Sequence, residues 1–132
     1  MLPRVYSRIT AGIRVNVRSS YVPEQSSPFQ HRYVFAYEIE ILNEADDAIK
    51  LLSREWHIID TQRTHQVVQG EGVIGQQPVI LPGEGYRYTS GAQLKTEAGQ
   101  MYGFYLMRWL DDQRQVHVEI PPFTLECPWR WN

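Results

Sequence analysis

Apolar and polar residues alternate one by one along much of this chain, and this period of two constrains the fold more than any other feature. The segment 13–18, for example, reads IRVNVR. Such alternation places apolar residues on one face of a β-strand and polar residues on the other, whereas an amphipathic helix repeats every 3.6 residues. No segment of ten or more residues shows the helical period. The chain is therefore predicted to be all-β.

Turn residues divide the alternating segments into seven to eight short strands. Residues 32–42 predict a long strand whose apolar residues, from Tyr33 to Ile41, share one face. Residues 49–60 are bulky at odd and even positions, which is typical of a central strand. The other predicted strands begin near residue 12 and lie at 65–69, 77–81 and 86–89, followed by a hairpin over 101–123 that turns at 111–114. The segment 21–31 is predicted to be a loop, because its two prolines lack the amide donor that a sheet requires.

Short strands joined by turns, with no helices to make parallel crossovers, predict an antiparallel sandwich of two sheets. The segment LPGEGY, which ends at Tyr86, resembles the tyrosine corner of immunoglobulin-like sandwiches. We therefore expect an immunoglobulin- or fibronectin type III-like fold. A length of 132 residues suits one domain over 1–132, with a core at about 9–127 and a tail at 128–132.

Charge and composition argue against several classes of partner. A net charge of -2 and a pI near 6.1 remove the attraction that usually dominates nucleic-acid binding. No apolar run is long enough to span a membrane, and the first residues do not resemble a signal peptide, so a cytoplasmic protein is expected. Cys127 is the only cysteine, which leaves no internal disulfide and no thiolate cluster.

Three glycines, Gly70, Gly72 and Gly75, have the G-x-G-x-x-G spacing of a dinucleotide-binding loop. Such a loop needs a helix that begins at its last glycine, and here Pro78 and another strand-like run follow instead. Glu71, between the first two glycines, would also repel a phosphate. We interpret the segment as a loop whose glycines permit positive φ. The alternative, a backbone-amide nest for a small anion, makes Gly70, Glu71, Gly72 and Gly75 the candidate ligand-binding residues.

The four histidines lie at positions 31, 57, 65 and 117, and none has the spacing of a known metal motif. They are interpreted as ordinary sheet histidines, with the alternative that folding brings strand partners together. No nucleophile elbow, carboxylate pair or Ser-His-Asp pattern is present. We predict no catalytic residues, no metal site and no cofactor.

Aromatic residues exceed what one small core usually needs. Eight of them lie in the predicted strands: Tyr33, Phe35, Tyr37, Trp56, Tyr102, Phe104, Tyr105 and Trp109. Most are expected in the core, and the others suit an interaction surface. In the tail, Trp129 and Trp131 flank Arg130, so the tail is either a frayed terminus or a segment that docks on a neighbouring subunit in a homodimer.

Several separate motifs occur together in a distinctive order: YVPEQSSP, RYVFAYEIEILNE, LLSREWHIID, GEGVIGQQPVILPGEGYRYTSG and VEIPPFTLE. In these segments the chain resembles the ApaG family over about residues 9–127. The resemblance implies a fibronectin type III or immunoglobulin-like sandwich. It also implies that the glycine-rich segment over Gly70, Glu71, Gly72 and Gly75 is a family feature.

The same resemblance suggests a biological setting without a defined reaction. Bacterial members of the family are associated genetically with diadenosine tetraphosphate hydrolase and with cobalt and magnesium tolerance, and related domains occur in eukaryotic proteins where a role in protein contact is presumed. Two functions stay open. The first is a non-catalytic module that binds a protein partner, and the second is a protein that binds a nucleotide, pyrophosphate or divalent metal through the glycine-rich loop.

Overall fold

The computed structural model describes the backbone of residues 4–131 and the side chains of residues 4–129, and within that range it contains strands and three short 3-10 turns but no α-helix. The strands are β1 (Val5–Thr10), β2 (Ile13–Tyr21), β3 (Tyr33–Asn43), β4 (Ile49–Asp60), β5 (His65–Glu71), β6 (Val79–Ile80), β7 (Gly85–Leu94), β8 (Ala98–Trp109) and β9 (Gln115–Glu126). The 3-10 turns are η1 (Pro23–Gln25), η2 (Pro28–Gln30) and η3 (Pro128–Trp131).

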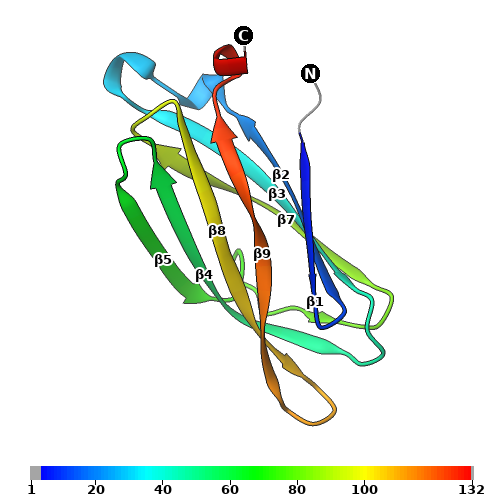
Figure 1. The fold of residues 1–132 in the computed structure, drawn as a ribbon. Helices are drawn as coiled ribbons and strands as arrows, with labels where there is room; N and C mark the ends of the chain where they lie inside the picture. The colour runs from blue at the N-terminus through cyan, green and yellow to red at the C-terminus, as the bar shows by residue number, and fades with distance from the viewer. Residues whose placement is uncertain (1–3, 132) are drawn as a thin grey trace.

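The strands form two antiparallel sheets that pack face to face (Figure 1). One sheet has the order β1-β2-β3-β7, and the other has the order β5-β4-β8-β9 with β6 paired to β4. The predicted all-β sandwich of two sheets is confirmed.

The core lies between the sheets and follows the alternation in the sequence. Every second residue of β3, from Tyr33 to Ile41, is buried, as the pattern predicted. The strand β4 is central, as expected, and a bulge between Leu51 and Ser53 shifts its alternation by one residue. Six of the eight strand aromatics are buried, whereas Tyr102 and Phe104 are only partly buried.

The two long edges of the sandwich differ. On one side β1 and β2 are linked to β9 by side chains: the Tyr6 and Thr124 hydroxyls lie 2.8 Å apart, and the Arg8 guanidinium lies 3.0 Å from the Glu119 carboxylate. On the other side β5 pairs only with β4, and β7 only with β3. Of the seven residues of β5, six are exposed. The sandwich is therefore tied along one edge and open along the other.

Two details differ from the sequence-based expectation. Within residues 4–131 there are nine strands, and the additional one is β1, which the alternation did not reveal because only Tyr6 and Thr10 in it are even partly buried. The Tyr86 hydroxyl donates to the side-chain oxygen of Gln76 at 3.0 Å, so it does not make the backbone bond of a tyrosine corner. Among the described residues there is no helix of the length and hydrophobicity needed to cross a membrane.

Candidate functional site

The glycine-rich segment is a tight turn that follows β5. Gly70 lies within β5, opposite Arg54 of β4. Gly72 and Gly75 have the positive φ expected of them, 62° and 73°, and Ile74 between them has a φ of 48°. Val73 and Gln76 exchange two backbone hydrogen bonds, of 2.8 and 3.0 Å, across the turn. The segment is thus a miniature hairpin of the type that favours glycine.

The backbone amides of this turn are used within the chain. Gly72 donates to the Leu52 carbonyl at 2.9 Å, and Val73 and Gln76 donate to each other. The Arg54 side chain donates from Nη1 to the carbonyl oxygens of Glu71 at 3.1 Å and Gly72 at 2.8 Å. Three amides that a nest would aim at an anion are therefore occupied, and the nearest cation faces carbonyl oxygens. These contacts favour the interpretation of a shaped turn over that of an anion nest.

A second candidate lies on the outer face of the sheet β5-β4-β8-β9, called the outer face below. The strand register arranges its side chains in rows that run across the sheet. From one end to the other the rows are Val79, Lys50, Arg108 and Gln115; Glu71, Ser53, Leu106 and His117; Gln69, Glu55, Phe104 and Glu119; and Val67, His57 and Tyr102.

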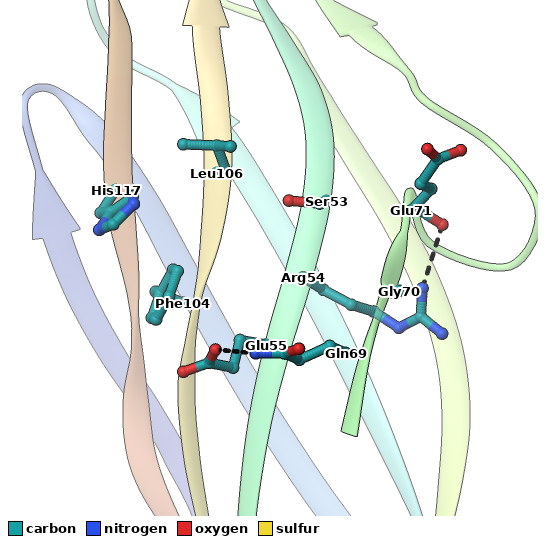
Figure 2. Close-up of a pocket in the computed structure, with 9 residues that line it drawn as sticks. All are labelled: Ser53, Arg54, Glu55, Gln69, Gly70, Glu71, Phe104, Leu106 and His117. Atoms are coloured by element: carbon teal, nitrogen blue, oxygen red, sulfur yellow. Dashed lines mark hydrogen bonds between the residues drawn. The ribbon is translucent and has the colours of Figure 1, made fainter. Parts of the chain in front are cut away.

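A shallow depression of about 340 Å³ lies in the middle of this face (Figure 2). Its lining residues are Ser53, Arg54, Glu55, Gln69, Gly70, Glu71, Phe104, Leu106 and His117. All nine come from four strands of one sheet, so the depression has a floor but no opposing wall. A small molecule bound there would keep much of its surface in water, whereas most small-ligand sites bury 70–90% of the ligand.

Beside the depression, Glu55, His57 and His65 form a chain of hydrogen bonds. The Glu55 Oε2 and His57 Nε2 atoms lie 2.9 Å apart, as do His57 Nδ1 and His65 Nε2. The other carboxylate oxygen of Glu55 accepts from the side-chain amide of Gln69. These bonds from His57 and Gln69 lower the pKa of Glu55, so that it is ionised at neutral pH. An ionised carboxylate can only accept, so His57 donates to Glu55 through Nε2. In a neutral His57 ring the other nitrogen, Nδ1, then accepts a hydrogen bond from His65.

The contact between His57 and His65 is the alternative left open by the sequence, in which folding brings histidines of partner strands together. A local turn produces this contact. Asp60 is buried at the end of β4, and its Oδ1 accepts from the amides of Gln62 and Thr64, both at 2.9 Å. The turn sets the β4–β5 register, which places His65 diagonally across from His57. In the sequence, Asp60 followed by a short polar segment could have indicated this tight turn, because aspartate commonly caps the amides of such turns.

Two aromatic rings pack against histidines on the outer face. Tyr102 stacks on His57 with ring centroids 4.9 Å apart, and Phe104 stacks on His117 at 4.4 Å. His31, by contrast, lies in the loop between β2 and β3 with a φ of 54°. The structure therefore brings three of the four histidines onto one face. Within the part of the chain that the structure describes, no group of three or more histidine, cysteine, aspartate or glutamate side chains has an arrangement that could hold a metal ion.

The C-terminal tail packs on its own domain. The Trp129 ring makes an edge-to-face contact with Tyr21 at 5.4 Å, and its Nε1 donates to Glu97 at 2.9 Å. Trp129 still exposes 44% of its surface. The Trp131 side chain lies outside the described residues. These contacts of Trp129 argue against a frayed terminus up to this residue, and docking on a neighbouring subunit stays a prediction.

Comparison with known proteins places this geometry in a family. The model of the ApaG domain matches residues 23–109, from η1 to the end of β8. A protein of Methylobacterium radiotolerans named Protein ApaG is 45% identical over 124 residues, which are 94% of this chain and 95% of the relative. Protein ApaG of Brucella canis is 43% identical over 124 residues, with the same coverage.

A solved structure agrees with the fold over nearly the whole chain. The crystal structure of a Bordetella pertussis protein described as ApaA shares 38% identity with this chain and superposes with a TM-score of 0.83. The match covers 97% of this chain and 98% of the other. The similarity in backbone fold therefore extends over both sheets.

Proposed function

The chain belongs to the ApaG family, and from that membership we propose that it is a non-catalytic, cytoplasmic module that binds a protein partner through the outer face. The genetic association of the family with diadenosine tetraphosphate hydrolysis and with cobalt and magnesium tolerance provides the first setting in which to look for that partner.

The observation that carries this proposal is the partly exposed aromatic surface in the middle of a sheet. Core-facing positions of β8 are buried, whereas its outward positions carry Tyr102, Phe104 and Leu106, which are only partly buried, and Phe104 and Leu106 line the open depression. Aromatic residues flanked by polar ones are the usual anchors of protein interfaces. The rings are also held in place, because each stacks on a histidine. Such preorganisation lowers the entropy lost on binding.

The open edge of the same sheet extends this surface. In β5, Val67 exposes 52% of its surface and Val68 exposes 39%. The strand contains no lysine or proline, which proteins commonly use to protect an open edge. A partner on the outer face could therefore continue onto β5.

Two features argue against the alternatives. The carboxylate and histidine that resemble catalytic groups, Glu55 and His57, lie on an open sheet without an enclosing wall among the described residues. The glycine-rich turn, which was the basis for nucleotide or pyrophosphate binding, uses the amides of Gly72, Val73 and Gln76 in backbone bonds. A binding function on the outer face requires neither feature.

Affinity capture with face-specific variants tests the proposal. Phe104→Glu places a charge at the centre of the outer face, and Gln93→Glu places one at an exposed position of β7 in the other sheet. Proteins captured by the wild type are identified, purified and titrated against each variant by calorimetry. We expect Phe104→Glu to weaken binding at least tenfold and Gln93→Glu to leave it unchanged.

The proposal is abandoned if a purified partner binds both variants with the affinity of the wild type, or if Gln93→Glu alone weakens it. Circular dichroism and thermal unfolding of the two variants show whether either loss is a loss of fold. Titration with ATP and with diadenosine tetraphosphate tests the competing function in parallel. Saturable amide shifts confined to residues 70–76 would favour it.

A further inference from the structure

Two cations lie side by side at one end of the outer face. Lys50 of β4 and Arg108 of β8 are directly opposite each other in the antiparallel register, and both point outward because their neighbours Ile49, Leu51, Met107 and Trp109 are buried. Opposed residues of an antiparallel pair have Cα atoms only about 4.5–5.5 Å apart. Like charges at this spacing destabilise a sheet.

Neither cation is neutralised within the described part of the chain. The ion pairs there involve Arg8, Arg14, His57, Arg87 and Arg114, and none of the side-chain hydrogen bonds there involves Lys50 or Arg108. The Nε atom of Arg108 is moreover buried without a hydrogen-bond partner. Buried polar groups are nearly always paired, so this nitrogen lacks the acceptor that a buried donor usually has.

On the side of β6 and along β8 the neighbours of the two cations are apolar, whereas Gln115 of β9 lies beside Arg108. Val79, the neighbour of Lys50 on β6, exposes 47% of its surface, and Leu81 just beyond it exposes 48%. The next outward residue along β8 is Leu106, followed by Phe104. Successive outward residues of a strand are about 6.6 Å apart. An extended segment lying along β8 would therefore meet the cations first and apolar side chains at every second residue thereafter.

From this charge complementarity we infer that Lys50 and Arg108 bind carboxylate groups of an acidic, extended segment of the partner protein. The inference rests on the proposed function, since it gives the chemistry of the partner at the same face. Arg108 is suited to bidentate contact with a carboxylate, and Lys50 adds a second charge. Apolar residues at alternate positions of the segment then lie over Leu106 and Phe104.

The test uses a synthetic nine-residue peptide as the probe. It carries two glutamates at one end and valine and phenylalanine at alternate positions after them, with threonine and serine between, and both chain directions are made. Binding to the full chain is followed by amide shifts in NMR spectra. We expect saturable shifts in β4 and β8 around Lys50 and Arg108 for one direction, and at least tenfold weaker binding to Lys50→Gln/Arg108→Gln.

Matched controls separate the possible outcomes. Lys95→Gln removes a charge from an exposed position outside the outer face and should bind as the wild type does. A peptide with glutamine in place of glutamate should bind at least tenfold more weakly, and added salt should weaken the glutamate peptide by screening. The double variant removes both repelling cations and with them the like-charge repulsion, so it is expected to unfold at no lower temperature than the wild type.

The inference is wrong if the glutamine peptide binds as tightly as the glutamate peptide, or if the double variant binds the glutamate peptide with unchanged affinity. It is wrong too if the glutamate peptide, in either chain direction, shifts no amides around Lys50 and Arg108 at millimolar concentration. It is also wrong if inorganic phosphate alone gives the saturable shifts. If the purified partner is lost with Phe104→Glu but retained by the double variant, the outer face still binds a protein and only its acidic character is refuted.

Discussion

Gly72 lies so close to Gln76 that a Cβ atom on residue 72 would stand 2.1 Å from the Gln76 carbonyl oxygen. That oxygen accepts the Val73 amide, so it cannot move away without opening the turn. The φ of 62° at Gly72 adds a second requirement for glycine. The second glycine of the G-x-G-x-x-G spacing, Gly72, is thus required by the shape of the hairpin turn.

Substitution of the turn glycines separates these two requirements. Gly72→Ala must bear both the steric conflict and the left-handed backbone, so we expect it to destabilise the fold by at least about 2 kcal/mol. Gly75 has a φ of 73°, but nothing lies within 4 Å of a Cβ added there. Gly75→Ala should therefore lower the free energy of unfolding by only about 1 kcal/mol. Urea unfolding of both variants measures the difference. Equal losses would show that the close approach to Gln76 is not a constraint.

The Arg54 side chain holds the start of this turn through the carbonyl oxygens of Glu71 and Gly72. Arg54→Ala leaves both carbonyls without that donor, and hydrogen bonds to a charged group are worth about 1.5–3 kcal/mol. We expect hydrogen exchange of the Gly72 and Val73 amides to accelerate, with β2 and β3 unaffected. Lys95→Ala is the control for loss of a cation. Unchanged exchange in the turn would mean that Arg54 does not anchor it.

The fold was largely predictable because one physical rule dominates it. The alternation of residues in β3 follows directly from its place in the sandwich, whereas β4 has bulky residues at odd and even positions because the bulge between Leu51 and Ser53 shifts its alternation. The strand β1 escaped prediction because it is held by edge contacts such as Tyr6 with Thr124, which no local pattern encodes.

The outer face was less predictable because it depends on register. Glu55 and His57 are two residues apart and could be assigned to one face, but the approach of His65 requires the turn capped by Asp60. The pairing of Lys50 with Arg108 joins residues far apart in the chain. The bulge at Leu51 also shifts the alternation, so even the outward position of Ser53 was not evident from periodicity.

Glu40 links three strands of the other sheet and makes stability depend on pH. Its carboxylate accepts from Asn16 Nδ2 at 3.1 Å and from Arg87 Nη2 at 2.6 Å. The bonds from Asn16 and Arg87 lower the pKa of Glu40 below its ordinary value of 4.5. A carboxylate whose pKa is lowered by folding stabilises the fold above its unfolded pKa, and this stabilisation is lost as the pH falls through the folded pKa.

Glu40→Gln should therefore be less stable than the wild type at pH 7, by roughly 0.2–1 kcal/mol because the site is partly open to solvent. The difference should shrink below about pH 4.5 and vanish where both forms carry a neutral group. Urea unfolding from pH 7 to pH 3 measures it. A difference that stays constant over this range would rule out the ionised carboxylate as its source.

Trp129 joins the tail to the body of the domain through Tyr21 and Glu97. Trp129→Ala should destabilise the fold by about 1–2 kcal/mol, since it loses an aromatic contact and a hydrogen bond. Deletion of residues 128–132 tests the separate prediction that the tail supports self-association. If full-length and shortened chains sediment identically, that role is excluded, and the stability of Trp129→Ala still reports the contact within the chain.

The hydroxyls of Tyr88 and Tyr105 meet 2.5 Å apart inside the sandwich and connect the two sheets. Tyr105 is fully buried and Tyr88 nearly so. Removing one hydroxyl leaves the other buried without a hydrogen-bond partner, which costs about 1–3 kcal/mol of stability. Removing both leaves two apolar rings of nearly the same shape, and neither ring then has an unsatisfied polar group. Tyr88→Phe and Tyr105→Phe should each destabilise the fold more than the double variant does. A double-mutant cycle measures this coupling, and strictly additive losses would show that the two hydroxyls do not depend on each other.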